Sequence, residues 1–203
     1  MGAMETTTWP HVLPPHSAPD NELPHGVPLN AVLVRTDDVA VAATGAQVFS
    51  NGVLLTVTSR LRVEPPELGR HAAHRLFSMH SEGAPGEDEQ RFLLGVELAD
   101  GTTAANVPGG AQLRPSSGGG GGTSYNQTYW LTPVPPDGPL TFVCACAGLG
   151  VPETRVVVEG LDLTTASSHA TVLWAPQPRP TEPRPALEPR LPAGWFARHA
   201  GQE

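Results

Sequence analysis

Alternating apolar and polar positions are the clearest pattern in this chain, and they predict β-strands. The alternation is most regular over residues 53–63, where Leu, Val and Ser alternate mainly with Thr and Arg. A strand of this period buries one face and leaves the other largely in water. Because Asn51-Gly52 favours the positive φ angles of a tight turn, we expect residues 46–49 and 53–63 to form a hairpin.

Short strands of the same kind recur along the chain. Residues 39–44 and 46–49 predict two separate strands, and Asp100-Gly101 predicts the turn of a second hairpin. About nine candidate strands follow one another at roughly the spacing of 8 to 12 residues that is typical of sandwiches and barrels. We therefore expect an all-β fold, an antiparallel β-sandwich with an immunoglobulin-like or C2-like layout, and one short helix within residues 71–80.

The residue composition changes twice along the chain, which predicts three segments. Residues 1–26 combine Pro, His, Thr and acidic residues without a period, so we expect a disordered N-terminal arm. Residues 27–175 carry the predicted strands and form the sandwich domain. Residues 176–203 are rich in Pro, which favours extended polyproline II structure, and this C-terminal tail ends with the apolar residues Trp195 and Phe196.

Composition and charge exclude several classes of function. All 12 basic residues are Arg, so every mechanism that needs a Lys amine, such as a pyridoxal Schiff base or a Walker-type phosphate loop, is excluded. A formal charge of −8 with scattered arginines would repel nucleic acids and anionic membranes. The chain shows neither a leader peptide nor a run of about 20 apolar residues, so we expect a soluble, cytoplasmic protein.

Five consecutive glycines, residues 118–122, precede a stretch of aromatic residues. A P-loop would place Lys where Thr123 stands, and a dinucleotide fingerprint would place a helix after the glycines rather than a strand. We therefore expect a flexible loop that joins two strands. A small-ligand pocket beneath this glycine-rich loop is one alternative function.

Aromatic residues after the glycines predict an interaction surface. With the period of a strand, Tyr125, Gln127 and Tyr129 share one face, and Trp130 lies on the other face. Tyrosine is enriched at interface centres because it brings rigid amphipathic area at small entropic cost. We expect the tyrosine face to be half-exposed and to bind a partner, and Trp130 to be core. Trp195 and Phe196 are a second candidate contact at the end of the tail.

Two cysteines and two histidines suggest an alternative site. Cys144 and Cys146 share one face of a predicted strand, and a reducing compartment makes them reduced core residues. Together with His71 and His74, spaced i and i+3, they would form a Cys₂His₂ zinc or redox site. The C-x-C spacing is tighter than the C-x₂₋₄-C spacing of most zinc sites, which disfavours this alternative.

Several stretches between residues 116 and 174 carry a resemblance to a known group of proteins. They are the glycine run before Tyr125 and residues 129–131, 135–140, 142–144, 151–155 and 172–174. With these stretches the chain resembles a group of uncharacterised proteins found widely in actinobacteria. Members of this group, of unknown function, carry a Trp-Pro pair shortly after the position of Cys144, where this chain has Ala145-Cys146. The resemblance implies a single compact domain and no particular mechanism.

No catalytic motif accompanies these features. The sequence contains no Gly-x-Ser-x-Gly elbow, no His-Glu-x-x-His and no Cys-x-x-Cys. We therefore expect no enzymatic activity and no cofactor. The sequence favours a non-enzymatic module that acts by protein–protein contact with a partner or with a second copy through a sheet edge.

Overall fold

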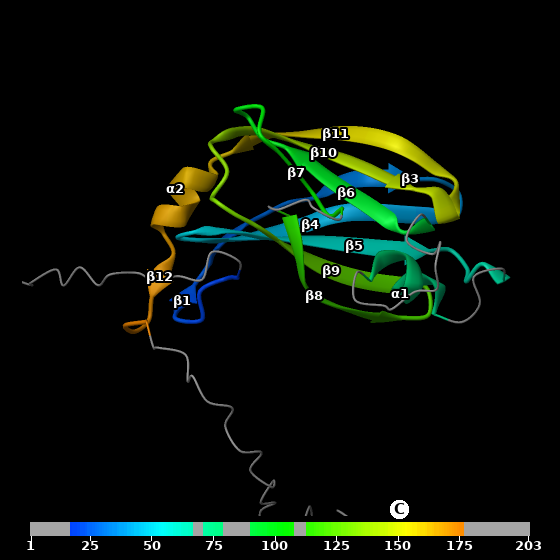
Figure 1. Ribbon diagram of the computed structural model, residues 1–203, viewed down its shortest axis with the longest axis horizontal. Helices are drawn as coiled ribbons and strands as arrows, with labels where there is room; N and C mark the ends of the chain where they lie inside the picture. Colours follow the sequence, from blue (N-terminus) through cyan, green and yellow to red (C-terminus); the bar gives the residue numbers. More distant parts are fainter. Residues whose placement is uncertain (1–16, 67–70, 79–89, 108–112, 177–203) are drawn as a thin grey trace, which may run out of the picture.

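The strands of this chain form two layers of antiparallel sheet. A computed structural model describes residues 17–66, 71–78, 90–107 and 113–176 (Figure 1). These ranges hold twelve strands and two short α-helices, and the two larger sheets face each other as an all-β sandwich. Trp195 and Phe196 lie outside the described residues. No helix in the described ranges is long and apolar enough to span a bilayer.

The larger sheet has six strands. Five of them follow the order β2–β4–β5–β9–β8, and the sixth, β3, also pairs with β4. Two strands share one edge of β4, because β2 pairs with its second half and β3 with its first half. The six strands are β2 (His25–Val27), β3 (Ala31–Arg35), β4 (Val39–Phe49), β5 (Gly52–Leu61), β8 (Leu113–Gly121) and β9 (Ser124–Leu131). β8 therefore forms one outer edge of this sheet.

The smaller sheet has four strands in the order β11–β10–β6–β7. Its strands are β6 (Phe92–Glu97), β7 (Thr103–Ala105), β10 (Gly138–Cys146) and β11 (Val151–Leu161). The turn at Asp100-Gly101 joins β6 to β7, as the second hairpin predicted from the sequence requires. β11 is the long outer edge of this sheet, and β7 is the short one.

A separate two-stranded ribbon joins the two ends of the described chain. β1 (Glu22–Leu23) pairs with β12 (Thr171–Val172), and Glu22 lies opposite Val172. The Glu22 carboxylate accepts hydrogen bonds from the backbone N–H and the hydroxyl of Ser50, which ties the ribbon to the turn between β4 and β5. Strand structure therefore begins at Glu22, so the expectation of a disordered arm up to residue 26 is wrong over residues 22–26.

Helices close the ends of the sandwich. α1 (Ala72–Phe77) falls within the predicted residues 71–80, and it lies against β9, β8 and β5. Phe77 of α1 packs on Phe92 of β6 in the smaller sheet, with ring centroids 5.2 Å apart. A second helix, α2 (Leu163–Ser168), and a 3₁₀ turn, η3 (Ala147–Leu149), add to the single helix expected from the sequence.

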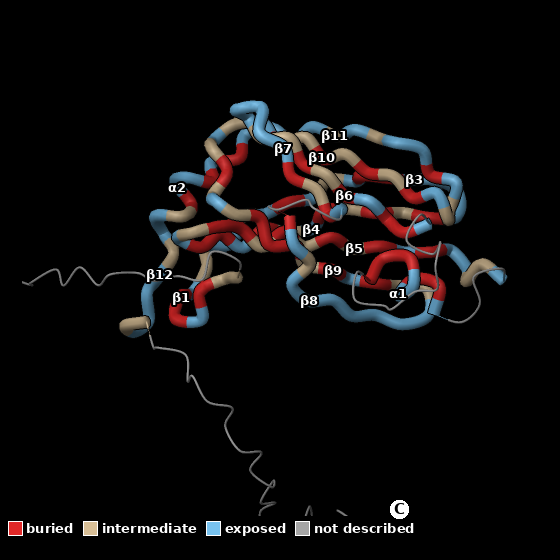
Figure 2. The backbone as a smooth tube through the Cα atoms, viewed as in Figure 1, coloured by how far each residue is buried: buried red, intermediate tan, exposed pale blue. Residues whose placement is uncertain are grey.

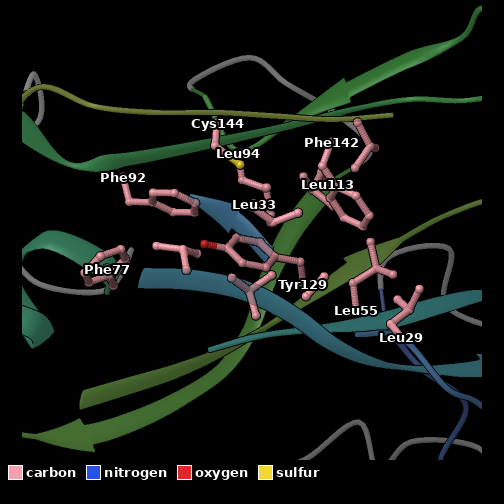
Figure 3. Packing of buried hydrophobic residues seen from close by; sticks show 14 of the residues in the cluster. Leu29, Leu33, Leu55, Phe77, Phe92, Leu94, Leu113, Tyr129, Phe142 and Cys144 are labelled. Atoms are coloured by element: carbon pink, nitrogen blue, oxygen red, sulfur yellow. The ribbon is translucent and has the colours of Figure 1, made fainter. Parts of the chain in front are cut away.

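Alternating side chains from both sheets fill the space between the layers. Figure 2 shows the buried residues on the inner strands, and Figure 3 shows the Tyr129 ring among side chains that include Leu55 of one sheet and Phe142 and Cys144 of the other. Phe142 is fully buried. Burial of such a side chain contributes about 1.5–3 kcal/mol to folding, so this shared interior holds the two sheets together.

Residues 39–49 form one strand and not the two predicted. β4 continues through a register shift between Ala43 and Gly45, where an irregularity lets the strand bend without ending. The hairpin predicted around Asn51-Gly52 is confirmed, since Phe49 pairs with Gly52. Only glycine fits at position 52, because a Cβ there would lie 2.5 Å from the Trp130 ring.

The glycine run is a strand, so the prediction of a flexible loop is wrong. Gly118–Gly121 belong to β8 and pair in register with residues 124–127 of β9, and Gly122, at φ 55°, makes the turn with Thr123. The reason is steric: a Cβ on Gly120 would lie 2.1 Å from the Ser124 carbonyl oxygen. Glycine here permits close approach of two strands.

Candidate interaction edge

The glycine half of β8 is the longest unbroken run of exposed residues within any described strand. Ser116 to Gly122 are all exposed, and among the described strands β8 pairs only with β9. Figure 2 shows this exposed rim along the lower border of the large sheet. Since glycines carry no side chains, nothing of their own shields the N–H and C=O groups of this edge. We call residues 116–121 the glycine edge.

Specific backbone groups of the glycine edge point outward. The two-residue turn of Gly122 and Thr123 makes Gly121 and Ser124 a hydrogen-bonded pair, and such pairs alternate along an antiparallel ladder. Consistent with this alternation, the backbone N–H and carbonyl of Ser117 both reach the Thr128 hydroxyl on β9, at 3.0 Å each. The N–H and C=O groups of Gly118 and Gly120 therefore face away from β9.

Three other sheet edges in the described chain are protected. β7 has only three residues, and short edges offer little to pair with. β11 begins with Val-Pro and carries the exposed charged residues Glu153, Arg155 and Glu159. Its Arg155 forms an ion pair with Glu97 across the outer face of the sheet. β3 lies against β11, and the Thr154 hydroxyl donates to the Leu33 carbonyl at 3.3 Å.

Polar atoms lie directly behind the glycine edge. The Gln127 side-chain Nε2 donates to the carbonyls of Ser117, at 2.7 Å, and of Thr128, at 2.9 Å. Gln127 Oε1 is buried and has no hydrogen-bond partner in the part of the chain that the structure describes, which costs about 1–3 kcal/mol for a group of this kind. Both Oε1 and the Tyr125 hydroxyl lie 2.6 Å from the place that a Cβ on Gly118 would occupy.

The three side chains predicted to form an exposed face are buried. Relative exposure is 3% for Tyr125, 2% for Gln127 and 1% for Tyr129. They do share one strand face, as predicted, but that face is turned into the sandwich, so the expectation of half-exposed tyrosines is wrong. Trp130, on the opposite face, is also buried, as predicted, and its ring packs edge-on against Phe49 and over Gly52.

The interior accommodates the polar ends of these side chains. Burial raises the pKa of Tyr129, and a hydrogen bond with Asn106 opposes this rise only in part. The Ser59 hydroxyl donates to the Tyr125 carbonyl at 3.1 Å. The Tyr125 ring meets His74 of α1 edge-on, with centroids 5.5 Å apart. Sequence periodicity could not decide which face is inner, because Tyr and Gln carry both apolar area and polar groups.

The predicted zinc ligands are not brought together. Cys144 and Cys146 are free, buried thiols on β10, and both point into the core, whereas His71 and His74 are exposed at α1. Burial raises the pKa of Cys144 to about 12 and that of Cys146 to about 11, so both thiols are protonated near neutral pH. Across the described ranges no three His, Cys, Asp or Glu side chains are grouped to hold a metal ion.

The glycine edge is the feature that sequence reasoning missed. One signal was present: Gly122-Thr123 is a two-residue connection between a glycine run and an alternating strand, which is the spacing of a tight hairpin.

Comparison of the chain with family models, with curated proteins and with solved structures found no match. Functional inference therefore rests on the geometry of the chain itself.

Proposed function

We propose that this protein is a non-enzymatic interaction module that binds an extended segment of another protein along the glycine edge. The observation that carries the proposal is the exposed, uncharged run Ser116–Gly121 on the outer edge strand of a six-stranded sheet. An extended peptide adds to such an edge through main-chain hydrogen bonds. In this chain those bonds would form with the outward groups of Gly118 and Gly120.

The partner is a different protein rather than a second copy of the chain. Two copies would each bring a formal charge of −8, and such like charges repel. Two glycine edges would also meet without any side chain to fix their register. A partner strand with its own side chains supplies that register. One added strand buries less than about 1,200 Å², so we expect a weak, transient complex.

Peptide selection on the full-length protein tests this proposal. Displayed random nonapeptides should enrich strand-forming sequences, and binding should protect the Gly118 and Gly120 amides from hydrogen exchange. Gly119 donates toward β9, so its amide should change less. If selection yields no binder, or if the protected amides lie elsewhere, binding along the glycine edge is refuted.

A matched pair of variants sharpens the test. Gly118→Ala and Gly118→Pro place a Cβ at the same position, close to side-chain ends that are able to shift. Only proline removes the outward N–H and covers the edge. We expect the selected peptides to bind Gly118→Pro at least about tenfold more weakly than Gly118→Ala, the equivalent of about 1.4 kcal/mol. Melting temperatures of the two variants control for folding, and equal affinities would contradict the proposal.

Self-association is a separate outcome of the same experiments. Light scattering over a range of protein concentrations reports the mass of the full-length chain. A dimer that Gly118→Pro dissociates and Gly118→Ala preserves would show that the occupant of the edge is a second copy. That result would overturn the choice of a different protein as partner.

A further inference from the structure

We propose that Gln127 selects partner segments which place a hydrogen-bond-donating side chain opposite Gly118. This inference rests on the proposed binding along the glycine edge. It concerns the side chain that the edge prefers, whereas the proposed function concerns main-chain pairing. Amide or hydroxyl side chains such as Asn, Gln, Ser and Thr are the expected class.

The first observation is the unpaired carboxamide oxygen. Gln127 is only 2% exposed, yet its Oε1 has no hydrogen-bond partner among the described residues, whereas Nε2 donates to two carbonyls. These two bonds fix the orientation of the amide, because exchanging the two ends would place an oxygen against carbonyl oxygens. Gln127 therefore presents an acceptor that no described residue satisfies.

The second observation is the gap at Gly118. Oε1 of Gln127 and the hydroxyl of Tyr125 both lie 2.6 Å from the place of the absent Cβ. Any side chain at position 118 would displace them and would separate them from a strand added to the edge. Glycine instead leaves only main chain between this pair of polar atoms and the incoming strand.

Strand geometry places one partner side chain at this gap. Residues directly opposite each other in an antiparallel pair project to the same face, with Cβ atoms about 4.5–5.5 Å apart. The partner residue opposite Gly118 therefore projects to the inner face, beside Tyr125 and Gln127. Asn there offers donors to Oε1. Asp offers only acceptors when ionised, and Leu offers neither, although the three side chains are similar in size.

Oε1 is covered in the unbound chain, so the main chain at Gly118 has to shift slightly when the donor arrives. Gly118 and Gly119 allow such a shift because glycine populates a wide range of backbone angles. The partner side chain then donates a hydrogen bond to Oε1, so the buried acceptor becomes paired.

The experiment uses the nonapeptides selected on the full-length protein. Cross-strand NOEs to Gly118 identify the peptide residue that lies opposite it, and that residue is changed in turn to Asn, Asp and Leu. We expect the Asn peptide to bind about fivefold more tightly than the Leu peptide, in line with one net hydrogen bond, and the Asp peptide to bind no better than Leu. The Gln127 side-chain amide signals should shift only with Asn.

Two variants test the role of Gln127. Gln127→Met keeps the length of the side chain and removes the acceptor, so the preference for Asn over Leu should disappear. Gly118→Ala should also reduce that preference because its Cβ takes the place next to Oε1, and this variant retains Gln127 should the Met variant fold poorly. If peptides bind the glycine edge and Asn, Asp and Leu bind alike, this inference fails and the proposed function stands. If no peptide protects the Gly118 and Gly120 amides, the proposed function itself fails.

Discussion

The edge strands on the two sides of this sandwich differ in how well they are protected from pairing with another strand. On one side β8 ends the large sheet with exposed glycines whose outward backbone groups have no described strand beside them. On the other side β3 and β11 lie against each other, Thr154 bonds to the Leu33 carbonyl, and charged residues line β11. Natural sheets commonly protect their edges against unwanted pairing. The proposed peptide binding rests on this contrast between a bare edge and a protected one.

The largest expected effect is on the rate at which the two cysteines of the protected side are alkylated. Cys144 and Cys146 lie on β10, next to β11, and burial raises their pKa values to about 12 and about 11. An unfolded thiol has a pKa of about 8.5, so at pH 8 the native thiols carry far less thiolate. Iodoacetamide should label them at least about a hundredfold more slowly in the native protein than in urea. Fast native labelling would show that the β11 side opens readily and is not a protected edge.

The same pKa values fix the sign of a pH effect. Because the thiol pKa is higher in the folded than in the unfolded chain, the unfolded chain releases these protons first as pH rises. Stability contributed by the two thiols is complete below about pH 8.5 and falls as pH rises toward 11. Urea unfolding at pH 7 and pH 10, compared with a Cys144→Ala/Cys146→Ala variant, measures this loss.

The next effect tests whether the glycines of β8 are equivalent. A Cβ on Gly120 would lie 2.1 Å from a backbone carbonyl oxygen, whereas a Cβ on Gly119 would meet nothing within 4 Å. We expect Gly120→Ala to lower the free energy of unfolding by about 2–3 kcal/mol because the hairpin has to open. Gly119→Ala should raise it by about 0.5 kcal/mol, since alanine loses less chain entropy on folding. Equal effects in urea titrations would argue against close strand approach at Gly120.

The smallest effect tests the contact that closes the other side. Thr154→Val removes the hydroxyl that lies 3.3 Å from the Leu33 carbonyl and 3.4 Å from the Cys144 carbonyl, and it keeps the shape of the side chain. We expect a loss of about 0.5–1 kcal/mol in urea unfolding, together with faster hydrogen exchange in β3. Thr141→Val on β10 is the matched control, because its hydroxyl has no hydrogen bond within the described structure. If both substitutions have the same effect, the Thr154 contact does not hold the side closed.

Periodicity predicted the elements better than it predicted their environment. The β4–β5 hairpin and the helix within residues 71–80 follow from local signals, because Asn51-Gly52 and the spacing of apolar residues act over a few positions. The inner face of β9 does not follow, since Tyr125 and Gln127 carry polar groups that suit either face, and only the assembled sandwich buries them. Burial of such residues depends on tertiary contacts that a single sequence does not display.

The glycine run shows the same limit more sharply. Gly118–Gly121 have low intrinsic preference for strand, and their extended structure comes from pairing with β9. Tertiary pairing also joined residues 39–49 into one strand across Gly45. In both places a glycine that resembles a break in the sequence is the residue that allows the backbone to bend or to approach a neighbour.

The β1–β12 ribbon has a mechanical consequence. Glu22 lies opposite Val172, so the chain enters and leaves this ribbon at the same end. A force that pulls residues 17 and 176 apart would act on the ribbon first and would open its backbone pairs one after another, as a zipper opens. The domain would therefore lengthen at low load by releasing this ribbon, while the two main sheets stay folded.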